Sequence, residues 1–284
     1  SFRHRQDGNY AAAHEDTLRS AEAGREQDPA TAARTLGNAA RCLALLEREV
    51  PRAESMLNEA QALAAKSGIE LIDIPWGLGL IRAFAGKYDE AVRLLESAVA
   101  FARREQDHWA ECEGLQRLAL IELERGNPSV ARERARAIAA VATKMGEGSE
   151  APFAVMLDAL AATALGEPNA ENHVELALAV LRQIDAKALL ARALAFAATT
   201  DLDRGHLARA ASRAEEALHA AEVVGRRSEI VTARAILAHV ALCRGDHAAA
   251  DRYAQAAATD LRDPHAVAAH ARRTALTLTD SHRS

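Results

Sequence analysis

The chain has few aromatic residues and no long apolar run. Aromatic residues make up 4% of its 284 residues, whereas 49% are hydrophobic and many of these are alanine. Small side chains let backbones approach closely, which suits packed helices better than sheets. No run of about 18 apolar residues occurs, and the start SFRHRQDGNY is not a signal sequence. Composition therefore predicts an all-α protein without a membrane span.

Cysteine is also scarce. Cys42, Cys112 and Cys243 lie far apart without a CxxC pair, which excludes a disulfide framework and a zinc ribbon. We therefore expect a reducing, cytoplasmic setting. The net charge is −5, with both signs mixed along the chain, so no basic face predicts direct nucleic-acid binding. The chain does not start with methionine, and we expect a processed product or an excised fragment.

Motifs for catalysis and cofactor binding are missing. There is no GxxxxGK[ST] or GxGxxG phosphate loop, and no GxSxG or HExxH sequence. His265 and His270 are five residues apart, which turns them away from each other on a helix. His206 and His247 fall at exposed turns. We expect structural or solvent-facing histidines, no catalytic residue, no metal and no cofactor.

Two pairs of acidic residues leave an alternative open. Paired carboxylates could serve acid–base catalysis, but we favour a solvated helix face on which they pair with Arg117 and Arg125. The run RERARA at 132–137 is likewise interpreted as an outer helix face. The acidic pairs are Glu111 with Glu113 and Glu122 with Glu124.

What the chain does contain is a repeat. Turn-plus-helix segments such as GKYDEAVRLLESAVA, which starts at Gly86, recur along it. Their register alanines are Ala13, Ala53, Ala91, Ala131, Ala210 and Ala250, separated by 40, 38, 40, 79 and 40 residues. The long step spans a drifted copy from Gly166, in which Glu171 takes the alanine position. Such a fixed period indicates a repeat architecture.

Each turn is preceded by another helix. The apolar spacing predicts first helices at 30–47, 72–85, 108–125, 151–165, 187–204 and 228–244. Neither helix of a pair can bury its apolar stripe alone, so successive pairs must stack. We predict one domain over 1–284, a right-handed α-solenoid of about six antiparallel pairs. Its approximate units are 1–27 (half, with a helix at 9–26), 28–68, 69–106, 107–146, 147–185, 186–226, 227–263 and 264–284 (half, with a helix at 264–279).

These units resemble the tetratricopeptide repeat (TPR). The clearest copy has Trp76, Leu78, Gly79, Gly86, Tyr88, Ala91, Leu95 and Ala98, and the last full copy has Leu237, Ala238, Gly245, Ala250 and Ala257. Arg82 replaces the family's aromatic residue, and the period of about 40 exceeds the 34 of the standard repeat. This longer form is similar to repeats of bacterial maltose-activator and LuxR-like regulators, and of peptide-sensing cytoplasmic regulators.

The resemblance implies that the first helices line a concave groove. Its lining residues would be Asn38, Asp73, Trp76, Glu113, Gln116, Arg117, Met156, Arg192, Phe196, Thr199 and His239. For Trp76, Met156 and Phe196, ordinary packing between helices is the alternative. A groove with aromatic anchors and charged clamps suits a peptide, a partner helix or a small ligand.

We therefore expect a non-enzymatic interaction module, the sensor or partner-binding domain of a bacterial regulator. The alternatives are a free-standing scaffold and an accessory domain of an enzyme. Self-association is left open.

Overall fold

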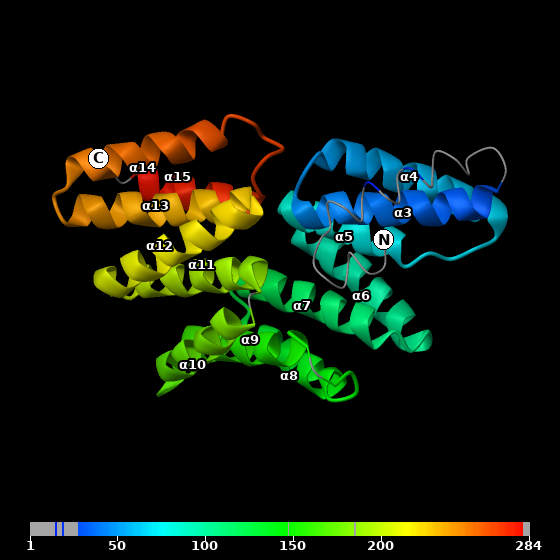
Figure 1. The fold of residues 1–284 in the computed structure, drawn as a ribbon, viewed down its shortest axis with the longest axis horizontal. Helices are drawn as coiled ribbons and strands as arrows, with labels where there is room; N and C mark the ends of the chain where they lie inside the picture. The colour runs from blue at the N-terminus through cyan, green and yellow to red at the C-terminus, as the bar shows by residue number, and fades with distance from the viewer. Residues whose placement is uncertain (1–14, 16–18, 20–27, 147, 185, 281–284) are drawn as a thin grey trace. The chain divides into compact units, whose positions relative to one another are not determined.

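The structure, a computed structural model, describes residues 28–280 except 147 and 185, together with Glu15 and Arg19. Within these residues it is entirely helical and has no strand (Figure 1). None of the described helices combines the length and the apolar character that crossing a bilayer requires. The half unit predicted at 1–27, with its helix at 9–26, falls outside the described residues apart from those two positions.

We call the first helix of each pair an A helix and the second a B helix. The A helices are α3 (Pro29–Leu46), α5 (Asp73–Phe84), α7 (His108–Glu124), α9 (Glu150–Ala164), α11 (Lys187–Asp203), α13 (Arg227–Cys243) and α15 (Ala269–Asp280). The B helices are α4 (Val50–Ser67), α6 (Tyr88–Arg104), α8 (Pro128–Ala142), α10 (Ala170–Gln183), α12 (Leu207–Val224) and α14 (His247–Asp260). The six predicted first helices of full pairs are confirmed to within one residue at each end.

A tight turn joins the two helices of each pair. Gly86 adopts φ 75°, in the left-handed region that only glycine enters without strain, and Gly126, Gly166, Gly205 and Gly245 have φ between 74° and 76°. The first described pair has no such glycine, and Glu47 and Glu49 take positive φ there instead. The predicted turn positions are therefore confirmed.

Two local predictions are corrected. In the drifted copy the buried alanine is Ala170, one residue earlier than predicted, and Glu171 is partly exposed. The last A helix begins at Ala269 and not at 264. Asp263 precedes a proline and its side chain accepts a hydrogen bond from the His265 backbone N–H at 2.9 Å, so a turn occupies this stretch.

The chain divides into two compact units, residues 1–114 and 115–284, and the division falls within α7. In unit 1, α3 contacts both α4 and α5, and α5 contacts α6. In unit 2, α9, α11, α13 and α15 contact one another in that order (Figure 1). Each unit thus contains a layer of A helices, and a B helix packs beside each of α3, α5, α9, α11 and α13.

The alanine register reflects close helix crossings. Ala91 on α6 is fully buried, and a Cβ on Gly79 of α5 would lie 2.8 Å from Leu95.

We expect Ala91→Leu to destabilise the protein by about 1–3 kcal/mol, because an overpacked core displaces its neighbours. Urea unfolding measures this effect. Ala100→Leu, on the exposed face of the same helix, should change stability by no more than about 0.5 kcal/mol. Equal stability of both variants would show that the register is wrong.

Candidate binding pocket

Unit 2 contains a pocket of about 470 Å³ that is lined only by A helices and the residue capping one of them. The ends of α7 and α9, the length of α11 and the first turns of α13 and α15 contribute to it. Helix α11 supplies the longest wall, with Arg192, Phe196, Thr199 and Asp203 at spacings of three and four residues. Such spacing places side chains on one helix face. Apolar residues, mostly alanine and leucine, cover most of the rest of α11 and are buried. This stripe, with Thr200 beside it, therefore carries the polar groups that α11 turns toward the pocket.

At the Arg192 end, a carboxylate lies between two arginines. The Nε atom of Arg192 donates to Glu229 at 2.8 Å, and Arg226 donates to the same carboxylate at 3.1 and 3.2 Å. Burial by itself would raise the pKa of Glu229, but the charges of Arg226 and Arg192 and their hydrogen bonds together lower it far below its ordinary value. Glu229 therefore stays ionised and fixes both guanidinium groups.

The middle of the pocket is aromatic. The rings of Phe196 and His270 are stacked, with centroids 6.3 Å apart and planes within 8° of parallel. The Nδ1 atom of His270 lies 3.4 Å from a carboxylate oxygen of Glu124. These contacts join α15 to α11 and α7 across one wall of the pocket.

The other end of α11 carries Asp203. Burial raises the pKa of its carboxyl group. The next residue, Arg204, donates to the backbone oxygen of Thr163 on α9 and pairs with Glu171 at 3.3 Å.

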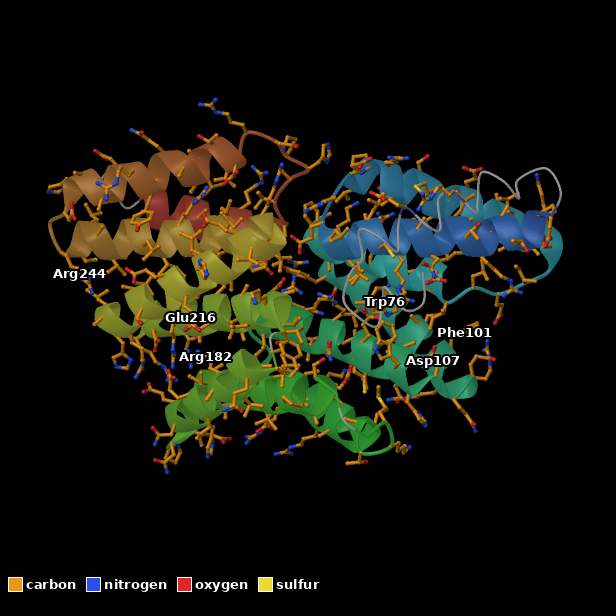
Figure 2. The ribbon with its side chains drawn as sticks, viewed as in Figure 1. Trp76, Phe101, Asp107, Arg182, Glu216 and Arg244 are labelled. Atoms are coloured by element: carbon orange, nitrogen blue, oxygen red, sulfur yellow. The ribbon has the colours of Figure 1, made fainter. Side chains whose placement is uncertain are left out.

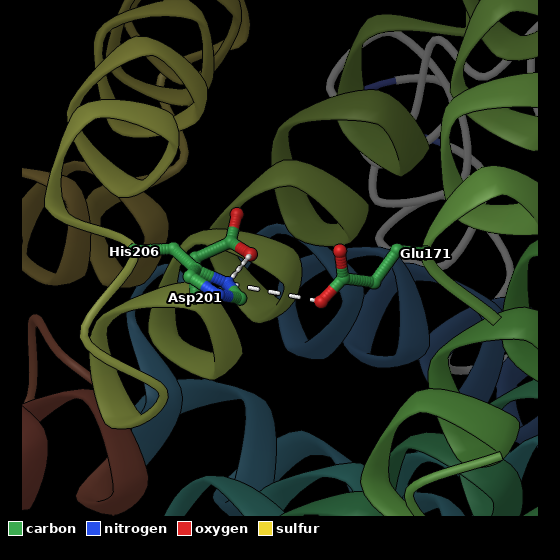
Figure 3. Close-up of side chains that lie close together, drawn as sticks. All are labelled: Glu171, Asp201 and His206. Atoms are coloured by element: carbon green, nitrogen blue, oxygen red, sulfur yellow. Dashed lines mark ion pairs between the residues drawn. The ribbon is translucent and has the colours of Figure 1, made fainter. Parts of the chain in front are cut away.

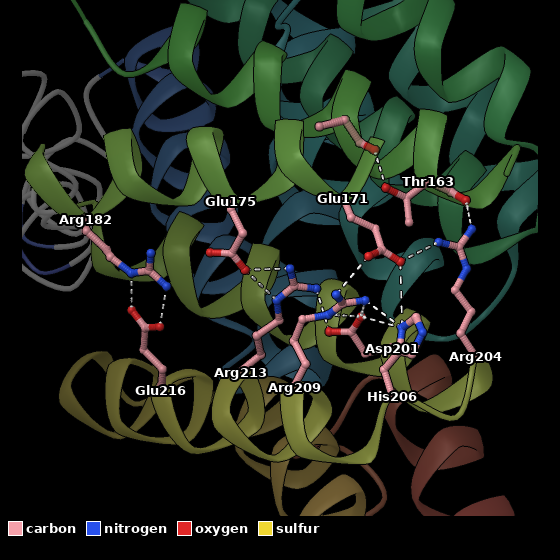
Figure 4. A network of polar contacts seen from close by, with 11 residues as sticks. Thr163, Glu171, Glu175, Arg182, Asp201, Arg204, His206, Arg209, Arg213 and Glu216 are labelled. Atoms are coloured by element: carbon pink, nitrogen blue, oxygen red, sulfur yellow. Dashed lines mark hydrogen bonds and ion pairs between the residues drawn. The ribbon is translucent and has the colours of Figure 1, made fainter. Parts of the chain in front are cut away.

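Arg204 connects the pocket to an ion-pair network on α10, α11 and α12 (Figure 4). Glu171, Asp201 and His206 offer ligand atoms within 4.8 Å of one another, a spacing that a metal ion could use (Figure 3). However, Arg209 pairs with Glu171 at 2.8 Å and with Asp201 at 2.7 Å. Its hydrogen bond lowers the pKa of Glu171. The guanidinium thus already neutralises these carboxylates, so we interpret the cluster as a structural network.

The same network links successive B helices. Arg213 donates to Glu175 at 2.7 Å and to Asp201 at 2.6 Å. Arg182 forms two bonds of 2.7 Å with Glu216, and both residues are marked in Figure 2. These bonds tie α12 to α10, so charge pairing adds to the alanine packing between repeats.

The structure brings only some of the predicted groove residues together. Arg192, Phe196 and Thr199 line the pocket. Met156 is fully buried and does not line this pocket, as the packing alternative expects. Gln116 is buried, Arg117 and His239 are partly buried, and none of the three lines this pocket.

The remaining four predicted residues lie in unit 1. Asp73 and Glu113 pair with Arg41 at 2.9 and 2.8 Å, and the Arg41 guanidinium lies 4.1 Å from the centre of the Trp76 ring. Trp76, which is labelled in Figure 2, and Glu113 are buried, so this is an internal cluster and not a groove surface. Asn38 lies one turn before Cys42, which contacts its side-chain oxygen at 3.9 Å. Sequence reasoning missed Arg41, although a single charge within the apolar segment NAARCLALL could have revealed it.

The prediction that the two acidic pairs lie on a solvated helix face is wrong for three of the four residues. Glu111, Glu113 and Glu122 are buried, because each has a partner that compensates its charge. Arg103 binds Glu111 at 2.6 Å, and Arg125 lies 3.6 Å from Glu122 as predicted. Of the four acids, Glu124 lines the pocket.

Two solved structures are similar to this chain in their fold. The Rap protein, crystallised in complex with competence and sporulation factor, aligns with a TM-score of 0.67 at 16% identity over 88% of this chain and 76% of that one. The apo form of the quorum sensor NprR from B. thuringiensis aligns with a TM-score of 0.57 at 12% identity over 90% of this chain and 84% of that one. The chain has a TPR-like fold. No family model and no curated protein sequence matches it.

Proposed function

We propose that this chain is a non-enzymatic, cytoplasmic module that binds a peptide or a protein segment. Its role would be that of the sensor or partner-binding part of a bacterial transcriptional or signalling regulator. The observation that carries the proposal is the pocket lined by A helices, to which five successive A helices of unit 2 contribute.

The lining of the pocket fits such a partner. An aromatic stack lies between a buried arginine–glutamate cluster and the carboxylate of Asp203, so an extended ligand would meet apolar and charged groups in turn. The two structural neighbours add support, since one was crystallised with competence and sporulation factor and the other is a quorum sensor.

A pocket that spans several repeats could also transmit a signal. A ligand that contacts α11, α13 and α15 together would favour the arrangement of these helices that fits it best. The maltose-activator or LuxR-like subtype stays a prediction, as does self-association.

Selection from a random peptide library on the immobilised full chain tests the proposal. We expect enriched peptides to bind in calorimetry and to lose at least tenfold in affinity for Thr199→Trp, because the indole fills the pocket. The matched control is Thr259→Trp, at an exposed site on α14, which should bind like the unmodified chain. Melting curves verify that both variants fold. A failure to enrich any peptide, or equal binding to Thr199→Trp, contradicts the proposal.

A further inference from the structure

The helix pair α9 and α10, in which the repeat motif has drifted, leaves several large apolar side chains exposed. Seven such side chains are exposed among the residues that the structure describes, and five of them belong to these two helices or to the residues that cap their C-termini. The five are Val155, Leu165, Leu176, Val180 and Ile184. Single exposed apolar residues are common, but their concentration on one repeat indicates a surface that a partner covers.

Three of these side chains follow one another along α10, and we call them the α10 stripe. Leu176, Val180 and Ile184 are spaced by four residues and are 66%, 40% and 40% exposed. Side chains four residues apart lie on the same side of a helix, one above the other. They form a ridge that packs into the groove of a second helix, with the two axes inclined by about 50°. The stripe therefore has the form of one half of a helix–helix contact.

Helix α10 lies between two other B helices of unit 2. On one side, Arg132 of α8 binds Glu167, in the turn before α10. On the other side, Glu171, Glu175 and Arg182 pair with residues of α12 at 2.8, 2.7 and 2.7 Å (Figure 4). These three are the acidic and basic residues of α10, so its charges are engaged with α12 and the α10 stripe is neutral.

The helices that flank α10 expose charges of opposite sign. Helix α8 and the turn after it expose two bases and one acid, which are Arg136, Lys144 and Glu133. Helix α12 exposes two acids, Glu215 and Glu222. A two-fold axis that runs along α10 would bring α8 of one copy next to α12 of the other. Unlike charges would then meet on both sides of the stripe, while the neutral centre causes no repulsion.

We propose that the α10 stripe is a contact between two copies of this chain. The two stripes pack against each other at the two-fold axis, and the exposed charges of α8 in one copy face those of α12 in the other. A second copy presents a neutral ridge and two flanks of opposite sign at once, which is the combination that this surface complements. The contact lies on B helices, whereas A helices line the pocket, so the inference does not depend on the proposed function.

Sedimentation of the unmodified chain over a dilution series tests the contact. We expect a reversible dimer with twice the mass of one chain. Leu176→Arg should raise the dissociation constant of the dimer about tenfold or more, because it places two like charges at the centre of the contact. The matched control is Leu276→Arg, at a leucine of α15 that is 48% exposed, and this variant should dimerise like the unmodified chain. Circular dichroism verifies that both variants fold.

A pair of charge reversals tests whether the partner is a second copy. Arg136→Glu and Glu215→Arg should each weaken self-association, because like charges then meet at both flanks. The Arg136 side chain is 68% exposed, so its replacement should leave the fold intact. When the two variants are mixed, the dimer should recover, because each flank of the mixed dimer again joins unlike charges.

Three results would overturn the inference. The first is a chain that stays monomeric at every concentration, even if a different protein covers the stripe. The second is self-association that Leu176→Arg leaves unchanged, since the contact would then lie elsewhere. The third is a failure of the two charge-reversal variants to recover the dimer when mixed, which would contradict the two-fold arrangement.

Discussion

Replacing Arg41 with methionine should destabilise the protein by about 3–5 kcal/mol, because Asp73 and the buried Glu113 lose the guanidinium group that binds them both. Only 2% of the Arg41 side chain is exposed, and the group binds Asp73 and Glu113 at once. Methionine fills much of the volume over Trp76 but cannot neutralise either acid. Urea unfolding followed by circular dichroism measures the change.

Two further variants show whether charge is the cause. Adding Asp73→Asn and Glu113→Gln to Arg41→Met should recover part of the lost stability, since the remaining groups are neutral. Arg52→Met removes a pair in which both side chains are about half exposed, at 49% and 55%, and should cost no more than about 1 kcal/mol. An effect at Arg41 no larger than that at Arg52 would contradict the explanation.

Replacing Glu229 with glutamine should destabilise unit 2 by about 3–5 kcal/mol near neutral pH, because Arg192 and Arg226 then lose the buried carboxylate that binds them both. The effect should depend on pH. The folded-state pKa of Glu229 lies below its ordinary value of 4.5, so its stabilising contribution is present above 4.5 and is lost as the pH falls below it. The stability difference between the unmodified chain and Glu229→Gln should therefore shrink in acid.

The control for Glu229 lies in the preceding helix. Glu222 on α12 is 48% exposed and pairs with Arg234 at 3.2 Å, so Glu222→Gln should cost no more than about 1 kcal/mol. Urea unfolding at several pH values compares the variants. A difference for Glu229→Gln that stays constant between neutral pH and pH values well below 4.5 would show that the charge of Glu229 is not the cause.

The fold was largely predictable because its signals are local. A glycine at five of the six described turns enters the left-handed region, and in four of these copies the alanine five residues later is buried, so both positions repeat with the period of the helices. The predictions failed where a local exception interrupted the pattern. Ala170 shifts the drifted copy by one residue, and the turn at Asp263 delays the last helix.

The pocket was less predictable because its walls come from distant parts of the chain. Helical spacing placed Arg192, Phe196 and Thr199 on one face of α11, and this face lines the pocket. The same spacing could not distinguish an open face from one covered by a neighbour, so it left open whether Trp76 and Met156 face a groove or pack between helices, and both are buried.

By itself, the sequence determined the TPR-like helix pairs, their turns and their alanine crossings, because each depends on residues close together in the chain. Only the tertiary structure decided which charges from distant parts of the chain are partners. Arg41 meets Glu113 across 72 residues, and Glu124 meets His270 across a longer separation. Such pairs form when stacking brings helices together, and the repeat pattern holds no information about the residues that vary between copies. The ligand chemistry that we infer depends on those residues.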